Sequence, residues 1–264
     1  MTSTTAIAKF GNLVASDLVD VTHNPKDLSS GGWWAVTQTF EGKFTAFKFA
    51  KIFTSEDLPE EIPAYERGIP VDAWQSSMSQ TQYEEAVETI RQDISRGWVY
   101  QANLCRVLTA QLESPLDLEA LHELMRRHNP APHAGYLRIP DYNIEIASAS
   151  PELFLSRHGD ILQSSPIKGT AKTAAQLLDK DSAENIMIVD LVRNDLSHAC
   201  QEGSVAVDHL LRLEEHPGLV HLVSDVSGRV ARDASWSDIL AATSPPGSVS
   251  GAPKSSALET ISRL

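Results

Sequence analysis

Residues 166–170, Pro-Ile-Lys-Gly-Thr (PIKGT), are the stretch about which the rest of the chain is organised. They follow an apparent hairpin and precede an acidic helix. Proline fixes the backbone φ angle and removes an amide donor, and glycine allows a close approach by other atoms. The stretch therefore predicts a reactive loop rather than a strand, with Lys168 as its reactive group.

Patterns on both sides of this stretch predict an α+β protein with antiparallel β-sheets flanked by helices. Alternating residues bounded by turn residues indicate consecutive hairpins before the loop. The expected strands are 33–36, 44–49, 98–110, 135–139, 143–147, 153–157, 161–164, 204–208 and 219–230. Apolar residues at three- and four-residue spacing indicate helices. One helix is expected from about residue 82 to a cap at Gly97. Others are expected at 117–128, 182–199 and 236–242, and a last helix has Pro253 in its first turn.

We expect the chain to divide into an N-terminal segment, residues 1–77, and a longer region, residues 78–264, which contains PIKGT. The Pro- and Glu-rich stretch from Ser55 to Asp72 is predicted to be a connector between sheet and helix. The 264 residues are enough to bury a core.

Composition narrows the possible functions. Hydrophobic residues make up 42% of the chain and charged residues 22%, as in soluble globular proteins. The net charge of -13 argues against a nucleic-acid partner, because phosphate neutralisation requires clustered Lys and Arg. There is no evident signal peptide, and no apolar run is long enough to span a membrane. Cys105 and Cys200 are predicted to be reduced thiols of a cytoplasmic protein.

Several polar residues have both a structural and a functional interpretation. Gln101 and Asn103 could belong to an ordinary half-exposed strand. Asp181 and Glu184 have capping-box spacing at a helix start, which is compatible with metal ligation. His221 lies in a predicted strand, where a lone histidine is more often structural than catalytic.

Taken together and in order, six blocks resemble the chorismate-utilising enzymes, which include anthranilate, isochorismate, salicylate and aminodeoxychorismate synthases. The blocks are YQANLCR (100–106), SASPELFL (148–155), PIKGT (166–170), AENIMIVDLVRNDL (183–196), HLVSDVSG (221–228) and SVSGAPK (248–254). The resemblance implies the anthranilate synthase-like fold. Lys168 replaces the alanine of anthranilate synthases, and Gln101 replaces the lysine base of isochorismate and salicylate synthases. This combination resembles the aminodeoxychorismate synthase component I branch, which aminates chorismate on the route to 4-aminobenzoate and folate.

The resemblance also implies roles for individual residues. Lys168 would attack the ring and Glu152 would act as general acid and base at the departing hydroxyl, a task that favours a raised pKa. His221 matches a pocket histidine. The implied substrate-binding residues are Gly169, Thr170 and Ser248, and the implied Mg²⁺ ligands are Glu184 and, through water, Asp181. A glutamine amidotransferase would supply ammonia, because neither cysteine lies in a nucleophile-like setting.

The chain ends at Leu264 with an apolar stripe still running, whereas the family continues into segments that hold magnesium and the substrate carboxylates. We therefore expect a C-terminally truncated chain with little or no activity of its own. The alternatives are an anthranilate synthase-like enzyme that tolerates lysine in the loop, a non-catalytic binding or regulatory domain, and an α+β domain whose loop lysine is only solvated.

Overall fold

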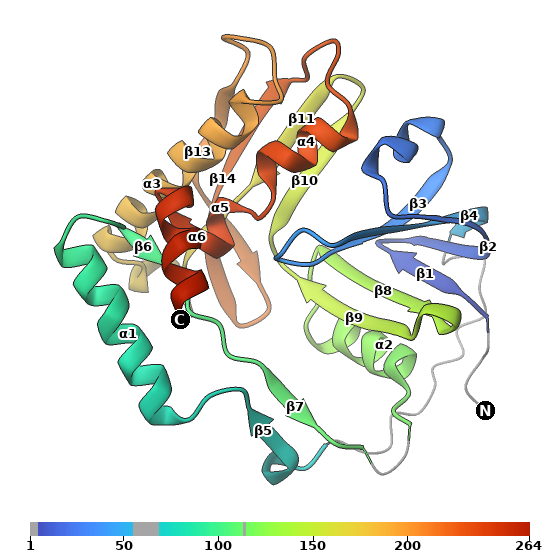
Figure 1. Cartoon of the computed structure of the whole chain (residues 1–264), viewed down its shortest axis with the longest axis horizontal. Coiled ribbons are helices and arrows are strands. Elements are labelled where there is room, and N and C mark those ends of the chain that lie inside the picture. Colours follow the sequence, from blue (N-terminus) through green and yellow to red (C-terminus); the bar gives the residue numbers. More distant parts are fainter. Residues whose placement is uncertain (1–4, 55–68, 113–114) are drawn as a thin grey trace.

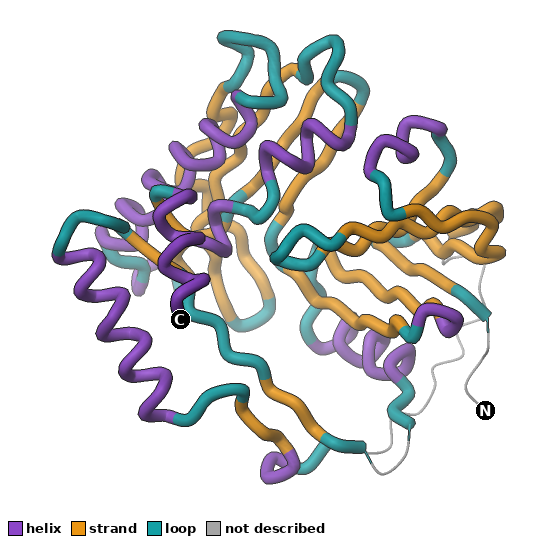
Figure 2. The backbone as a smooth tube through the Cα atoms, in the orientation of Figure 1, coloured by secondary structure: helices purple, strands orange, loops and turns teal. Residues whose placement is uncertain are grey.

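The computed structural model describes residues 5–54, 69–112 and 115–264. Within these ranges two large antiparallel sheets carry helices on their faces, which confirms the predicted α+β class. Figures 1 and 2 show the two sheets side by side, with the N-terminal strands in one and the later strands in the other. Residues 55–68, most of the predicted connector, lie outside the described residues.

The first sheet has six strands in the order β3-β4-β2-β1-β8-β9. Its strands are β1 (Ile7–Phe10), β2 (Leu13–Thr22), β3 (Trp33–Gln38), β4 (Phe44–Thr54), β8 (His133–Ile139) and β9 (Ile144–Ser150). Because β1 pairs with β8, the N-terminal segment and the later hairpin share one sheet. Small and aromatic side chains alternate along these strands and form a core that includes Ala8, Ala15 and Phe47.

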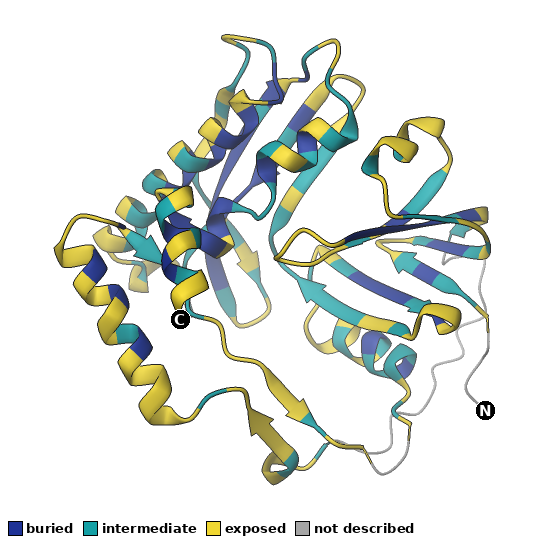
Figure 3. Cartoon of the chain, viewed as in Figure 1, coloured by how far each residue is buried: buried dark blue, intermediate teal, exposed yellow. Residues whose placement is uncertain are grey.

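The second sheet is built around β14 (Leu219–Arg229). The other strands are β10 (Leu153–His158), β11 (Ile161–Ser165), β12 (Ile167–Ala171) and β13 (Ala206–His216). On one side β14 pairs with β11 and then with β12, and on the other side it pairs with β13. With neighbours on both sides, β14 is buried along most of its length (Figure 3). The strand at 204–208 was predicted too short, since β13 continues to His216.

The consecutive hairpins were predicted correctly, but they do not form a single run in one sheet. The hairpin β8–β9 belongs to the first sheet and β10–β11 to the second. The chain passes between the sheets at Pro151, which has no amide hydrogen with which to continue a ladder. Alternation of side chains along a strand reports its pleat but not the sheet it joins.

The prediction of a loop at 166–170 was wrong, because Ile167–Ala171 is the strand β12. Pro166 lies immediately before it, and its carbonyl oxygen accepts a hydrogen bond from Ser224 N–H at 3.2 Å. The pairing then shifts by one residue, so that Lys168 and Gly169 stand opposite the single residue Leu222. The stretch is therefore a β-bulge within a sheet, and the poor strand-forming residues mark that bulge.

The bounds of the helices lie close to those predicted from the sequence, with one exception. Their bounds are α1 (Gln80–Ser95), α2 (Leu118–His128), α3 (Asp179–Ser197), α4 (Trp236–Thr243), α5 (Gly247–Ser250) and α6 (Lys254–Arg263). Ser79 and Gln82 form a capping box on α1, and Asp117 caps α2. The exception is α3, which begins three residues before its predicted start. Asp181 is thus its third residue rather than its cap, and the carboxylate accepts from Leu178 N–H at 2.8 Å.

The continuous strand predicted at 98–110 was also wrong. Only Gln101–Ala102 (β6) and Leu108–Ala110 (β7) are strands, and they pair in separate two-stranded sheets with Gly251–Ala252 (β15) and Trp74–Ser76 (β5). Near residue 253 the prediction was off by one position, since Pro253 precedes α6 instead of starting it.

The face of α3 that packs on the second sheet forms the second core. Its buried residues lie three and four positions apart, as required for one helix face. Members of this core are Leu162, Ile188, Val189, Val192, Leu196, Ala199, Cys200, Val226, Val230 and Ile239. This packing holds α3 against β12 and β14 and places its first turns beside the bulge.

Candidate active site

Lys168 and Glu152 meet at Ser248, which lies in the short helix α5. The ammonium group of Lys168 donates to the backbone carbonyl oxygen of Ser248 at 2.9 Å. The hydroxyl of Ser248 donates to the carboxylate of Glu152, which also accepts from the backbone N–H of Ile167. The backbone carbonyl and the hydroxyl of one serine thus hold the amine of Lys168 in β12 and the carboxyl group of Glu152, which lies just before β10.

Burial sets the protonation of Glu152. Loss of solvent raises the pKa of its carboxyl group, and the hydrogen bond from Ser248, the charge of Lys168 and the Ile167 amide offset only part of that rise. The direction is the one expected for a general acid. The same two oxygens remain able to accept a proton back in a later step.

Two amide side chains connect this centre to Glu184 on α3. Gln101 donates through Nε2 to Glu184 Oε1 at 3.2 Å, and Asn103 donates through Nδ2 to the carbonyl oxygen of Ser248 at 3.1 Å. The two amides approach each other at 3.5 Å. Gln101 does lie in a partly exposed strand, β6, as the ordinary-strand interpretation expects, but both amides also belong to the network that contains Lys168.

A magnesium ion fits these residues in kind. Mg²⁺ takes oxygen ligands and keeps several waters. Glu184 supplies a carboxylate, and Gln101 Oε1 is a buried oxygen with no hydrogen-bond partner among the described residues. Asp181 is committed to capping α3, and nowhere in the described ranges do three acidic, histidine or cysteine side chains gather for a metal. Water and substrate oxygens would have to complete the coordination.

Gly169 and Asp181 are packed directly against each other. Gly169 has a φ angle of +92°, and a Cβ built on it would lie 2.9 Å from the Cβ of Asp181. The residue must therefore be glycine for two structural reasons, the backbone angle and the close approach of α3. Its predicted contact with substrate stays a prediction.

Thr170 and His221 form a second polar pair across the β12–β14 ladder. Thr170 Oγ1 and His221 Nδ1 are 2.8 Å apart. Burial, and to a smaller degree the neighbouring charge of His216, lowers the pKa of His221. His221 is therefore neutral at pH 7, and its catalytic role stays a prediction.

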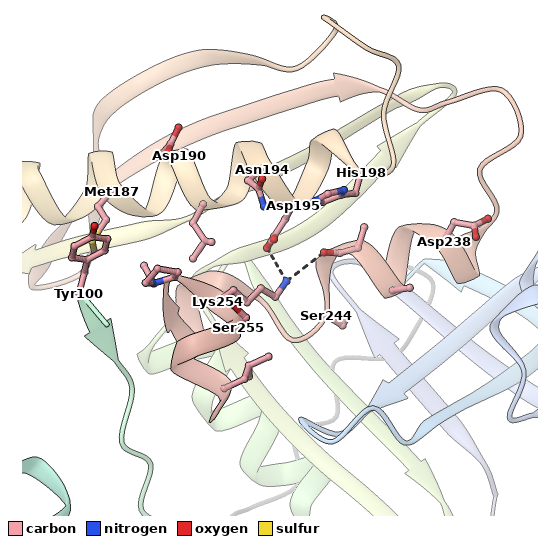
Figure 4. Close-up of a pocket in the computed structure, with 16 residues that line it drawn as sticks. Tyr100, Met187, Asp190, Asn194, Asp195, His198, Asp238, Ser244, Lys254 and Ser255 are labelled. Carbon is pink, nitrogen blue, oxygen red and sulfur yellow. Dashed lines mark hydrogen bonds and ion pairs between the residues drawn. The ribbon is translucent and has the colours of Figure 1, made fainter. Parts of the chain in front are cut away.

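Lys254 supports the loop that carries Ser248. Its ammonium group contacts Asp195 on α3 at 3.0 Å and the carbonyl oxygen of Ala242 at 3.3 Å (Figure 4). Asp195 also accepts from the backbone N–H of Gly247, the first residue of α5. One buried carboxylate thus fixes the starts of α5 and α6, and through them Ser248.

Several hollows adjoin this region, and a small one contains predicted site residues. Glu152 and Ser248 line a cavity of about 150 Å³. A hollow of about 990 Å³ between α3, α4 and α6 contains Lys254 but none of Lys168, Glu152 and Glu184. The connected network around Lys168, rather than the larger hollow, is the candidate active site.

Residues 17–264 match the chorismate binding enzyme family. The chain belongs to this family. Aminodeoxychorismate synthase component 1 of Salmonella typhimurium is 38% identical over 204 residues, which are 73% of this chain and 44% of that protein. An anthranilate synthase component I-like protein of Synechocystis sp. is 33% identical over 244 residues, 88% of this chain and 48% of that protein. The chain thus spans about half the length of these curated relatives.

Solved structures of chorismate-utilising enzymes confirm the predicted fold. An isochorismate synthase of Bacillus anthracis superposes with a TM-score of 0.77 at 20% identity, over 99% of this chain and 78% of that one. Anthranilate synthase component I of Streptococcus pneumoniae gives a TM-score of 0.68 at 24% identity, over 97% and 66%. Separately, the described helices include none with the length and apolarity needed to cross a membrane.

Two residues of this hydrogen-bonded network were not predicted to be site residues from the sequence. Asn185 follows Glu184 and is fully buried beside Lys168, and Asn103 contacts Ser248. The available signal was an amide at a position where helix or strand periodicity predicts an apolar side chain. A buried amide requires hydrogen-bond partners, so such a position indicates a polar network.

Proposed function

We propose that this protein is the chorismate-aminating component of an aminodeoxychorismate synthase, which forms 4-amino-4-deoxychorismate for 4-aminobenzoate and folate synthesis. The observation that carries the proposal is the convergence of Lys168 and Glu152 on Ser248. The pairing of Lys168 with Gln101 favours amination, and the Salmonella typhimurium relative bears the corresponding name.

In the proposed reaction the lone pair of a neutral Lys168 amine forms a C–N bond to the substrate ring. The ring C–O bond breaks, and the hydroxyl leaves as water with the proton of Glu152. Ammonia then forms a C–N bond to the same ring carbon, and the bond to Lys168 breaks and releases the neutral Lys168 amine. The proton that the new ammonium group loses returns to the carboxylate of Glu152. Ser248 orients both groups, since its carbonyl oxygen accepts from the amine and its hydroxyl donates to the carboxyl.

The proposal extends to a cofactor and a partner. The carboxylate of Glu184 and the side-chain amide oxygen of Gln101 would hold Mg²⁺, and the ion would neutralise a carboxylate of chorismate. Asp181 would act only through water. A glutamine amidotransferase subunit would supply ammonia, an assignment supported by the name "component 1" of the relatives. The two unpaired cysteines favour a cytoplasmic enzyme.

Product formation from chorismate, ammonium and Mg²⁺, measured by liquid chromatography and mass spectrometry, tests the proposal. Wild type is compared with Lys168→Ala and with Lys172→Ala, which removes an exposed lysine four residues away. In a protein that carries these 264 residues at the full length of the relatives, we expect aminodeoxychorismate from wild type and Lys172→Ala and none from Lys168→Ala. Formation of anthranilate would instead indicate the anthranilate branch. A chain that neither binds chorismate in calorimetry nor forms product would contradict the proposal.

A further inference from the structure

The bulge in β12 interrupts the β12–β14 ladder at the place where the carbonyl groups of Lys168 and Leu222 lie. Lys168 and Gly169 stand opposite Leu222, so regular pairing is interrupted between Ile167 and Thr170. The first turns of α3 cover this region and shield the side chain of Asn185 there from water. Unpaired carbonyl groups at such a place would destabilise the fold.

Asn185 on α3 supplies the missing donors. Its Nδ2 donates to the carbonyl oxygen of Lys168 at 3.3 Å and to that of Leu222 at 2.9 Å. The residue is 0% exposed. The side-chain amide of Asn185 thus donates one hydrogen bond to β12 and one to β14.

The orientation of this amide is fixed by its partners. Carbonyl oxygens only accept, so the nitrogen of Asn185 must face Lys168 and Leu222. Its oxygen then faces the hydroxyl of Ser224, which donates to it at 2.6 Å. The same hydroxyl accepts from Leu211 N–H at 3.0 Å, which connects the amide to β13 as well. If the amide were flipped, the side-chain oxygen of Asn185 would face the carbonyl oxygens of Lys168 and Leu222, and none of these oxygens can donate.

We propose that Asn185, held by Ser224, is a positioning residue that fixes the bulge and thereby the direction in which the Lys168 side chain leaves β12. Lys168 is anchored at both ends: Asn185 binds its carbonyl oxygen, and Ser248 binds its amine. Without Asn185 the bulge can relax toward regular pairing, and a one-residue change of register turns a side chain to the other face of the sheet. The catalytic consequence rests on the proposed function, whereas the position of Lys168 does not.

The test measures the rate at which a soluble amine-acylating reagent modifies each lysine of the full chain, by peptide mass spectrometry. The variants are Asn185→Leu, which removes the amide at similar size, and Ser224→Ala, which leaves the amide but removes the hydroxyl that donates to its oxygen. Val192→Ala, which destabilises the same helix away from the bulge, is the matched control. Lys254, which is also largely buried, serves as the internal reference.

We expect Asn185→Leu to change the rate at Lys168 relative to Lys254 by at least about fivefold, the scale of one lost hydrogen bond. Ser224→Ala should give a smaller change in the same direction, and Val192→Ala none. An unchanged ratio in a folded Asn185→Leu protein would overturn the inference. Should that variant fail to fold, Ser224→Ala decides in the same way: a changed ratio supports the inference and an unchanged ratio overturns it.

A kinetic measurement adds the catalytic consequence. If the chain aminates chorismate, Asn185→Leu should lower kcat about tenfold or more and leave KM nearly unchanged, because a misplaced amine affects the chemical step rather than substrate binding. Equal losses in Asn185→Leu and Val192→Ala would show a general loss of stability and overturn the positioning role. A wild-type chain without turnover contradicts the proposed function alone, because the modification rates are measured without substrate.

Discussion

Replacing Gly169 by alanine should destabilise the protein by more than its backbone angle alone explains. An L-residue at the observed φ of +92° costs ~1–2 kcal/mol. The new Cβ would also lie 2.9 Å from Asp181 Cβ and 3.3 Å from Leu222 Cβ, and overpacking of this kind costs ~1–3 kcal/mol. We expect the free energy of unfolding to fall by about 2–5 kcal/mol in total, which is a large part of the stability of a typical domain.

Gly42 provides the matched control for this prediction. Its φ angle is +88°, and a Cβ built on it would meet no atom within 4 Å. Gly42→Ala should therefore carry only the backbone cost of ~1–2 kcal/mol. The entropy that alanine removes from the unfolded chain is common to both variants and cancels in their difference. Urea denaturation followed by far-UV circular dichroism gives the two free energies. Equal losses in the two variants would refute the idea that α3 and the bulge are sterically locked together.

Three further predictions concern titratable groups. Because burial raises the pKa of Glu152, the stability this group contributes is complete below its unfolded value of ~4.3 and is lost as pH rises through the folded value. Glu152→Gln should therefore be more stable than wild type at pH 7 and equal to it below about pH 4 in denaturation experiments. Lys254→Met should cost ~3–5 kcal/mol, because it leaves Asp195 buried without its partner, and Asp195→Leu should restore much of that loss in the double variant. His216→Gln should raise the pKa of His221 slightly in NMR titrations, since burial, the larger cause of its lowered pKa, remains while the smaller effect of His216 is removed.

Each of these predictions has an exposed control. Glu202→Gln should not change the pH dependence of stability, and Arg91→Met, which breaks an exposed ion pair with Glu88, should cost ~0–1 kcal/mol. His158→Gln should leave the titration of His221 in place. A Glu152→Gln variant with the same stability profile as wild type would contradict the burial argument. A Lys254→Met loss no larger than that of Arg91→Met would contradict the buried ion pair.

Much of the fold could be predicted from the sequence because it depends on short-range patterns. The helices at 117–128 and 236–242 follow from apolar spacing and a capping residue, and the structure places them within one residue of those bounds. The hairpins follow from alternation and turn residues. The predictions were wrong where contacts between distant parts of the chain determine the structure. The division of the hairpins between two sheets and the early start of α3 both depend on packing across the molecule.

For the candidate site, too, local sequence predicted some features and contacts between distant residues determined the others. The sequence alone singled out Lys168, Glu152, Glu184 and Ser248, since their motifs occur in the order shared by the chorismate-utilising enzymes. It could not show that the amine of Lys168 in β12 and the carboxyl group of Glu152 just before β10 are both held by one serine, which lies 80 residues after Lys168.

Tertiary structure alone decided what PIKGT is. Its proline and glycine locally disfavour a strand. The stretch is nevertheless a strand, because its backbone pairs with residues 220–224, some fifty positions later in the chain. Asn185 then completes the interrupted ladder from a helix that no local pattern connects to it. Local sequence determines which conformations a segment can adopt cheaply, whereas the pairing of distant backbone groups determines which one it adopts.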